Sequence, residues 1–294
     1  MLRNYIKIAF RNLLRNRVFS FINILGLGLG IAAFVLILEY VSLEKSINQF
    51  HANKDQMYRL LNEDVEGNSW PEMAPGLAPV AKDNFPEIKE YCRFEEGIAQ
   101  GIVQSPATEA SFREETIGYA EGNFFTFFSF PLIKGQPSTF SKPNIVFISE
   151  SYAKKYFGAD DPMGKILVLH NQFGKTTYNV EGIYADMTDL SDIRYDMLFS
   201  LETLRNPANL NTNDWANLDN FDSGFINTYF LLKENTDAQN LEKKMNDLER
   251  KLNEENDGVT LRLQPLTNMH LATSLNEPLQ TTGNLKYVYM LASV

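Results

Sequence analysis

The stretch LHNQFGKTT ends in Gly174-Lys175-Thr176, residue types that close a Walker A phosphate-binding loop. The full pattern, G-x-x-x-x-G-K-[ST], also needs a glycine five positions earlier, where this chain has Leu169. The stretch lies between two segments predicted as strands, whereas a phosphate loop leads into a helix N-terminus. We therefore predict no nucleotide site and no bound cofactor.

Two further sets of residues could bind a metal ion. The histidines are far apart and form no H-E-x-x-H or comparable spacing; they are His51, His170 and His270. Four closely spaced aspartates suggest calcium; they are Asp186, Asp189, Asp192 and Asp196. They lack the alternating carboxylates, central glycine and closing glutamate of an EF-hand, which favours a solvated surface loop. We predict no catalytic and no metal-binding residues.

An uncharged run, Phe19–Leu38, matches the length of about 20 residues that an α-helix needs to cross a bilayer. A cleaved signal peptide is the alternative, but its apolar core is shorter, roughly 7–15 residues, and ends at a small-residue cleavage site. No such site follows Glu39. We predict a retained transmembrane helix over residues 18–41.

The charge distribution predicts the orientation of that helix. Five of the 27 basic residues precede it, and none of the 37 acidic residues does. Positive charge beside a membrane helix stays in the cytoplasm, so the rest of the chain is expected outside it. That remainder has 15 more acidic than basic residues, which argues against nucleic acid as a partner.

Residues 1–17 have the period of an amphipathic helix, with apolar positions on one face and basic ones on another. The basic face consists of Arg3, Lys7, Arg11 and Arg15. Such a helix suits the inner surface of the membrane lipid. Two interpretations stay open: a cytoplasmic coupling helix that contacts a partner subunit, or a topology signal without a partner.

Within the membrane segment, small residues recur one helical turn apart and could let another helix approach closely. They are Gly26, Gly28, Gly30 and Ala32. Glycine is also common in membrane helices without any such role. At the other end, residues 285–294 turn apolar from Tyr287 onward, which favours the start of a second membrane helix over a short terminal strand or helix.

The sequence predicts the α+β class, with a single cysteine, Cys92, that is expected to be buried. Strand, helix and strand are expected at residues 56–62, 75–84 and 89–95. The order returns with strands at residues 226–233 and 259–266 around an amphipathic helix that begins at a capping box, Thr236 and Gln239. Two βαβ units suggest a split ferredoxin-like, porter-type subdomain made of residues 46–95 and 226–284.

Residues 96–225 form the predicted insert, a mostly β subdomain. Short strands are expected at residues 145–149, 165–169 and 178–183, and a helix at 150–157 that Gly158 stops. The run FTFFSF, residues 125–130 with Phe124 before it, is either an exposed aromatic surface or core, and we favour core.

Several separated motifs resemble one family. IVFISESYAKKYFGADDPMGKILVL, residues 145–169, and YNVEGIYADMTDLSDIRYDMLFSL, residues 178–201, resemble the core of the MacB-like periplasmic domain. YIKIAFRNLLRNRVFSFINILGLGLGIA resembles the cytoplasmic and first membrane helices of FtsX/MacB permeases, and LQPLTNMHL the lead-in to their second one. The family often has N-S-H-x-x-F-D where this chain has Leu190–Asp196, without the histidine.

The resemblance implies a non-catalytic permease subunit of an ABC transporter in the bacterial inner membrane, with most of this chain periplasmic. It further implies a dimer, a separate ATPase subunit, and for some members a periplasmic adaptor or outer-membrane channel. Such permeases serve efflux, export or lipoprotein and cell-envelope work. The alternatives are the extracytoplasmic sensor domain of a membrane-anchored receptor and a secreted domain.

Overall fold

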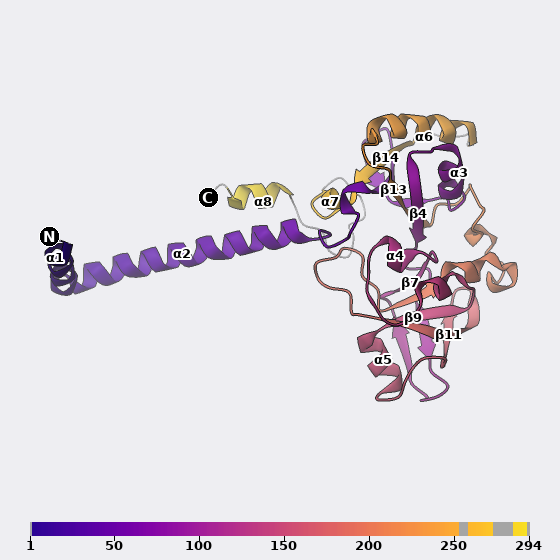
Figure 1. The fold of residues 1–294 in the computed structure, drawn as a ribbon, viewed down its shortest axis with the longest axis horizontal. Helices are drawn as coiled ribbons and strands as arrows, with labels where there is room; N and C mark the ends of the chain where they lie inside the picture. The colour runs from indigo at the N-terminus through magenta and orange to yellow at the C-terminus, as the bar shows by residue number, and fades with distance from the viewer. Residues whose placement is uncertain (1, 253–257, 273–284, 293–294) are drawn as a thin grey trace. The chain divides into compact units, whose positions relative to one another are not determined.

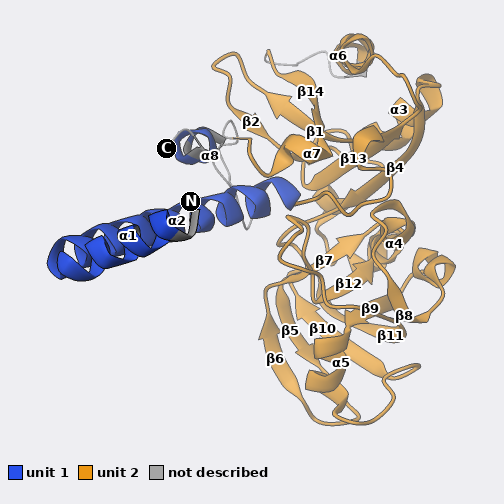
Figure 2. Cartoon of the chain, turned by 60° about the vertical axis from the view of Figure 1, so that its left-hand side comes forward, with its two compact units in different colours: residues 1–46, 284–294 blue, residues 47–283 orange. Residues whose placement is uncertain are grey.

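The computed structural model describes residues 2–252, 258–272 and 285–292 of an α+β chain (Figure 1). The chain divides into two compact units, which Figure 2 colours separately. Unit 1 comprises residues 1–46 and 284–294, and unit 2 comprises residues 47–283.

Unit 1 is helical. Its elements are α1 (Leu2–Arg15), α2 (Arg17–Ser46) and α8 (Leu285–Ala292). The 30 residues of α2 are long and apolar enough to cross a membrane, as judged by length and composition, and they include the predicted span. Between α1 and α2, the Ser20 hydroxyl donates to the carbonyl of Leu13 at 3.0 Å, so it satisfies a carbonyl at the end of α1.

In unit 2, four strands pair antiparallel in the order β14-β1-β13-β4. These strands and their helices are β1 (Met57–Glu63), α3 (Leu77–Asn84), β4 (Ile88–Phe94), β13 (Ile226–Leu232), α6 (Ala238–Leu252) and β14 (Thr260–Pro265). For the strands and α3, each bound lies within two residues of the expected one. For α6 no bounds were predicted, only a capping box and an apolar stripe. One face of these strands packs on α3 and α6 through Leu60, Phe230 and Leu241.

The sheet continues past β4 without a break, because Phe94 pairs with Ala120 of the next strand. The order from there is β7 (Ile117–Ala120), β12 (Met197–Ser200), β9 (Ile145–Ser149), β11 (Gly174–Tyr184), β10 (Ile166–Asn171), β5 (Gly101–Gln104) and β6 (Ser111–Glu114). Short strands join at the sides: β2 (Ser69–Trp70), β3 (Glu72–Met73) and β8 (Leu132–Gly135). The pairs β7–β12 and β9–β11 are parallel, so this part of the sheet is mixed.

Helix ends test two of the sequence predictions. α5 (Glu150–Phe157) begins at Ser149, whose hydroxyl accepts from the Tyr152 N–H, and ends at Gly158 with φ +62°, as predicted. The capping box before α6 is wrong. Asp237 accepts from the Asn240 N–H at 3.1 Å, whereas the Thr236 hydroxyl donates to a preceding carbonyl. The capping side chain is therefore one residue later than predicted.

The aromatic run is core, as favoured. Its five phenylalanines, on and after α4 (Phe124–Phe127), are 0–6 % exposed. They pack with Phe94, Phe147 and Tyr229 and with two residues of α7 (Leu266–Met269), namely Leu266 and Met269. Cys92 lies in the same cluster and is fully buried, which confirms that prediction.

Candidate functional site

Asp192 joins three distant segments of unit 2. Its side chain is fully buried, with one carboxylate oxygen 2.8 Å from the Asn48 amide nitrogen and the other 2.7 Å from Nδ1 of His270. An ionised carboxylate only accepts hydrogen bonds, so the Asn48 amide donates to one oxygen and Nδ1–H of His270 donates to the other. We call Asn48, Asp192 and His270 the Asp192 joint.

Asn48 also bonds the backbone of the loop formed by residues 186–196, which contains Asp192. Its N–H donates to the Leu190 carbonyl at 2.8 Å, and its side-chain oxygen accepts from the Asp192 N–H at 3.0 Å. The residue is 0 % exposed and has φ +61°, a left-handed conformation that asparagine tolerates better than most residues. Asn48 therefore suits both the turn after α2 and the pairing with the loop.

The segment after Asn48 is also fixed to the aromatic core. Nδ1 of His51 lies 2.5 Å from the carbonyl of Phe128, and the Ala52 N–H donates to the Ser129 hydroxyl at 3.2 Å. Burial lowers the pKa of His51, which favours its neutral form. Before β1 begins, residues 48–52 are thus bound both to residues 190–192 and to residues 128–129.

Both ends of the aspartate-containing loop are anchored. Asp186 accepts from the Ser151 N–H at 3.0 Å at the start of α5, and the backbone of Asp196 bonds Thr116 and Ser149 at 2.8 and 2.9 Å. The prediction of a solvated loop is correct for Asp189, whose side chain is 94 % exposed, but it is wrong for Asp192. Asp192 is buried because two polar side chains from distant segments meet it there.

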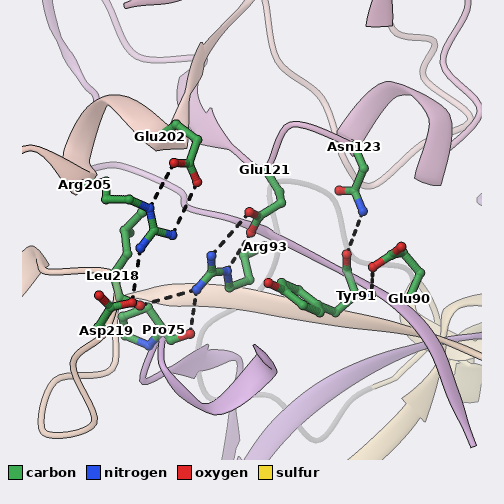
Figure 3. Close-up of polar contacts among 10 residues, drawn as sticks. All are labelled: Pro75, Glu90, Tyr91, Arg93, Glu121, Asn123, Glu202, Arg205, Leu218 and Asp219. Atoms are coloured by element: carbon green, nitrogen blue, oxygen red, sulfur yellow. Dashed lines mark hydrogen bonds and ion pairs between the residues drawn. The ribbon is translucent and has the colours of Figure 1, made fainter. Parts of the chain in front are cut away.

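A second polar cluster lies where β4 meets the residues after β7, and Figure 3 shows it. The Arg93 side chain is 2 % exposed and bonds both oxygens of Glu121, at 2.6 and 3.3 Å. It also donates to the carbonyls of Pro75 at 2.7 Å and Leu218 at 3.4 Å (Figure 3). Burial opposes its charge, but Glu121 outweighs this and raises the pKa of Arg93.

Arg93 therefore connects β4, the segment before α3 and two parts of residues 96–225. Nearby, Arg205 pairs with Glu202 and Asp219 on the surface (Figure 3). A hollow of about 280 Å³ beside this cluster is lined by charged and polar groups, including Lys82, Glu90 and Glu202. The cluster holds parts of unit 2 together.

The structure separates the residues selected for chemistry. Gly174-Lys175-Thr176 lies in the β10–β11 hairpin, away from any helix start, because Gly174 pairs with Asn171 and Lys175 with His170. Over residues 2–252, 258–272 and 285–292, no three His, Cys, Asp or Glu side chains gather as a metal site. Of the three histidines, His270 alone takes part in the Asp192 joint.

The predicted helix-packing residues face open space in unit 1. A Cβ added at Gly26, Gly28 or Gly30 would meet no described atom within 4 Å, and Ala32 is exposed. Three of the predicted coupling residues, Lys7, Arg11 and Arg15, are exposed on α1; Arg3 lies on the same helix, but its side chain is outside the described residues. Their roles stay predictions.

The Asp192 joint was missed at the sequence level. Its members stand 144 and 78 residues apart, so no local spacing links them. One signal was present: Asp192 occupies the position where the resembling N-S-H-x-x-F-D pattern has its histidine. Here a histidine reaches the loop from position 270 instead.

The sequence matches the family model of the MacB-like periplasmic core domain over residues 20–248. None of the curated proteins matches it. A domain of a protein assigned as a permease, from Porphyromonas gingivalis, is similar in structure with a TM-score of 0.62 and 18 % identity, over 78 % of this chain and 96 % of that one.

Two other solved structures are similar at lower scores. The periplasmic region of MacB from Actinobacillus actinomycetemcomitans has a TM-score of 0.50 and 13 % identity, over 73 % of this chain and 90 % of that one. The extracellular domain of the noncanonic ABC-type transporter YknZ from Gram-positive bacteria has a TM-score of 0.48 and 11 % identity, over 70 % and 99 %. At these identities the likeness concerns the fold.

Proposed function

Because this chain belongs to the family of the MacB-like periplasmic core domain, we propose that it is the permease subunit of a MacB/FtsX-type ABC transporter. The subunit relays the ATP-driven movement of a separate ATPase chain to its periplasmic domain, for efflux, export or cell-envelope work. The order of the parts carries the proposal: a basic helix, then a 30-residue apolar helix that leads into unit 2, with the family match running from residue 20 in that helix to residue 248.

The charge distribution supports an inner-membrane location with unit 2 in the periplasm. All the basic residues before α2 would remain in the cytoplasm under the positive-inside rule. The exposed basic face of α1 then lies on the side where an ATPase subunit works. We propose this face as the coupling surface for that subunit.

The strand order β14-β1-β13-β4 supports the proposed division of unit 2. It is the order of a ferredoxin-like βαββαβ sheet whose third strand arrives only after a long insert. In this proposal residues 46–95 and 226–284 form the porter-type subdomain and residues 96–225 the inserted one. The open face at Gly26 and Gly30 would receive another membrane helix, of this permease or of a second copy.

The test measures whether nucleotide bound to the ATPase moves the periplasmic domain. Val65 is 84 % exposed in the turn after β1, so Val65→Cys gives a site for a spin label in the full permease, reconstituted with its ATPase. Cys92 is fully buried, and burial raises the pKa of its thiol well above the usual value, so it stays unlabelled.

We expect the distance between labels on the two copies of a dimer to change when a nonhydrolysable ATP analogue is added. An ATPase without its Walker A lysine is the control and should give no change. A nucleotide-bound complex whose label distance stays constant would contradict the relay, and a label without a partner spin would contradict the dimer.

A further inference from the structure

We propose that the Asp192 joint is the rigid link through which α2 moves the inserted part of the periplasmic domain. This inference rests on the proposed relay and specifies where the movement enters unit 2. Asp192 acts as a positioning residue: it makes the segment after α2 and the segment after α7 share one carboxylate.

The first argument is the shortness of the connection to α2. The helix ends at Ser46, and Asn48 is already held by three hydrogen bonds to residues 190–192. Two residues of extended chain span about 7 Å, so little slack separates the helix from its anchor. A displacement of the end of α2 must therefore either carry the loop with it or break these bonds.

The second argument concerns the elements to which the loop of residues 186–196 is bound. At one end Asp186 bonds the start of α5, and at the other end Asp196 bonds Thr116, just before β7, and Ser149 at the end of β9. All these elements belong to residues 96–225. The loop therefore links the chain after α2 to the insert directly, without passing through the four strands β14-β1-β13-β4.

The third argument is that the opposite chain segment reaches the same carboxylate. His270 follows α7 directly, and Leu266 and Met269 of that helix are fully buried in the aromatic core. His270 itself is 4 % exposed. The segment after α2 and the segment after α7 are thus bound to one residue, so that they move together.

The chemistry of the joint suits a link that stays closed. Each carboxylate oxygen of Asp192 has a donor, and the Asn48 amide uses both its oxygen and its nitrogen. A buried polar network in which the groups have partners is rigid, while removal of one member leaves buried donors without an acceptor.

The loop supplies its own control. Asp189 lies three residues before Asp192, its side chain is almost fully exposed, and it pairs with Arg194. Asp189→Asn therefore removes a carboxylate from the same loop without touching the joint.

The test uses the permease with its ATPase, reconstituted in lipid vesicles, and follows the nucleotide-dependent distance between copies from a spin label on the inserted part, at Lys154→Cys of α5, a side chain that is 70 % exposed. We expect Asp192→Ala to lose the distance shift while the ATPase still binds the nucleotide analogue, and Asp189→Asn to keep it. The exchange Asn48→Asp with Asp192→Asn should restore the shift, because an amide and a carboxylate again face each other with the roles reversed.

Two conservative variants decide the matter if Asp192→Ala does not fold. The amide nitrogen of an asparagine takes the place of His Nδ1, whereas that of a glutamine takes the place of Nε2. His270→Asn should therefore keep the shift and His270→Gln lose it. A wild-type shift in Asp192→Ala, or equal shifts in both His270 variants, would overturn the joint while leaving the relay intact; no shift in the unmutated permease would instead refute the relay itself.

Discussion

The Arg93 cluster and the Asp192 joint are both buried and charged, but they differ in how the charge is compensated. Arg93 meets an opposite charge, Glu121, together with two backbone carbonyls. Asp192 meets an amide and a histidine. The first is a bidentate pair between an arginine and a carboxylate, and in the second the two oxygens of one carboxylate are shared between side chains from two distant segments.

The two clusters also differ in what they connect. Arg93 joins β4 to Glu121, only 28 residues later, inside the continuous sheet of unit 2. The Asp192 joint spans 144 residues on one side and 78 on the other, and it binds the chain close to α2. This difference fits the proposed relay, in which Arg93 stabilises the fold of unit 2 and Asp192 transmits the movement of α2.

The largest effect is expected for Arg93→Met. It leaves Glu121 and the carbonyls of Pro75 and Leu218 without their donor, and breaking a buried pair in this way costs about 3–5 kcal/mol. Denaturant unfolding of the detergent-solubilised chain measures the loss. Arg205→Met is the matched control, since this surface arginine is 46 % exposed and its ion pairs are worth about 0–1 kcal/mol. If both variants lose the same free energy of unfolding, the buried pair of Arg93 is worth no more than the surface pairs of Arg205.

A smaller effect is expected when the Asp192 joint is opened. Asn48→Ala and Asp192→Ala should each destabilise the chain, because each leaves buried polar groups unpaired at about 1–3 kcal/mol per group. Residues in contact are coupled, so the double variant should lose less than the two single losses combined. Strictly additive losses in a double-mutant cycle would show that the two side chains do not act as a unit.

The smallest effect is a change in pH dependence at Glu95, a third buried ionisable group. Burial raises the pKa of Glu95 to about 8, although the N–H groups of Ile98, Ala99 and Tyr119 lower it. The folded chain then keeps a proton that the unfolded chain releases near its ordinary pKa of 4.5. Stability from this group is full below about pH 4.5 and is lost as the pH rises through about 8.

Thermal unfolding measured from about pH 4.5 to about pH 8, between the unfolded and the folded pKa of Glu95, checks the sign. The unmutated chain should become less stable as the pH rises, and Glu95→Gln should flatten this slope because glutamine does not ionise. Glu115→Gln, at a side chain that is 72 % exposed, should leave the slope unchanged. If the pH dependence of stability persists in Glu95→Gln, other groups cause it. Glu95 would then not be a buried group that affects stability as Arg93 and Asp192 are expected to do.

Local sequence determined the elements. The uncharged run and its basic flank predict α2 because hydrocarbon excludes charge, and the apolar periods predict the four strands β14, β1, β13 and β4 within two residues. The short strands β5, β6, β7 and β12 were not predicted, because four residues are too few to show a period. Ser149 and Gly158 set the ends of α5 through bonds and backbone angles that belong to the helix itself. The motifs over residues 145–201 indicated the family, which the match over residues 20–248 confirms.

Tertiary structure decided which polar residues are buried. In sequence Asp189 and Asp192 are equivalent members of one acidic run, yet one is exposed and the other is enclosed by Asn48 and His270. In the sequence His270 is one of three isolated histidines, and only in the folded chain does it contact Asp192. Burial of a charge depends on partners that supply hydrogen bonds, and when they lie 144 and 78 residues away, only the folded chain brings them together.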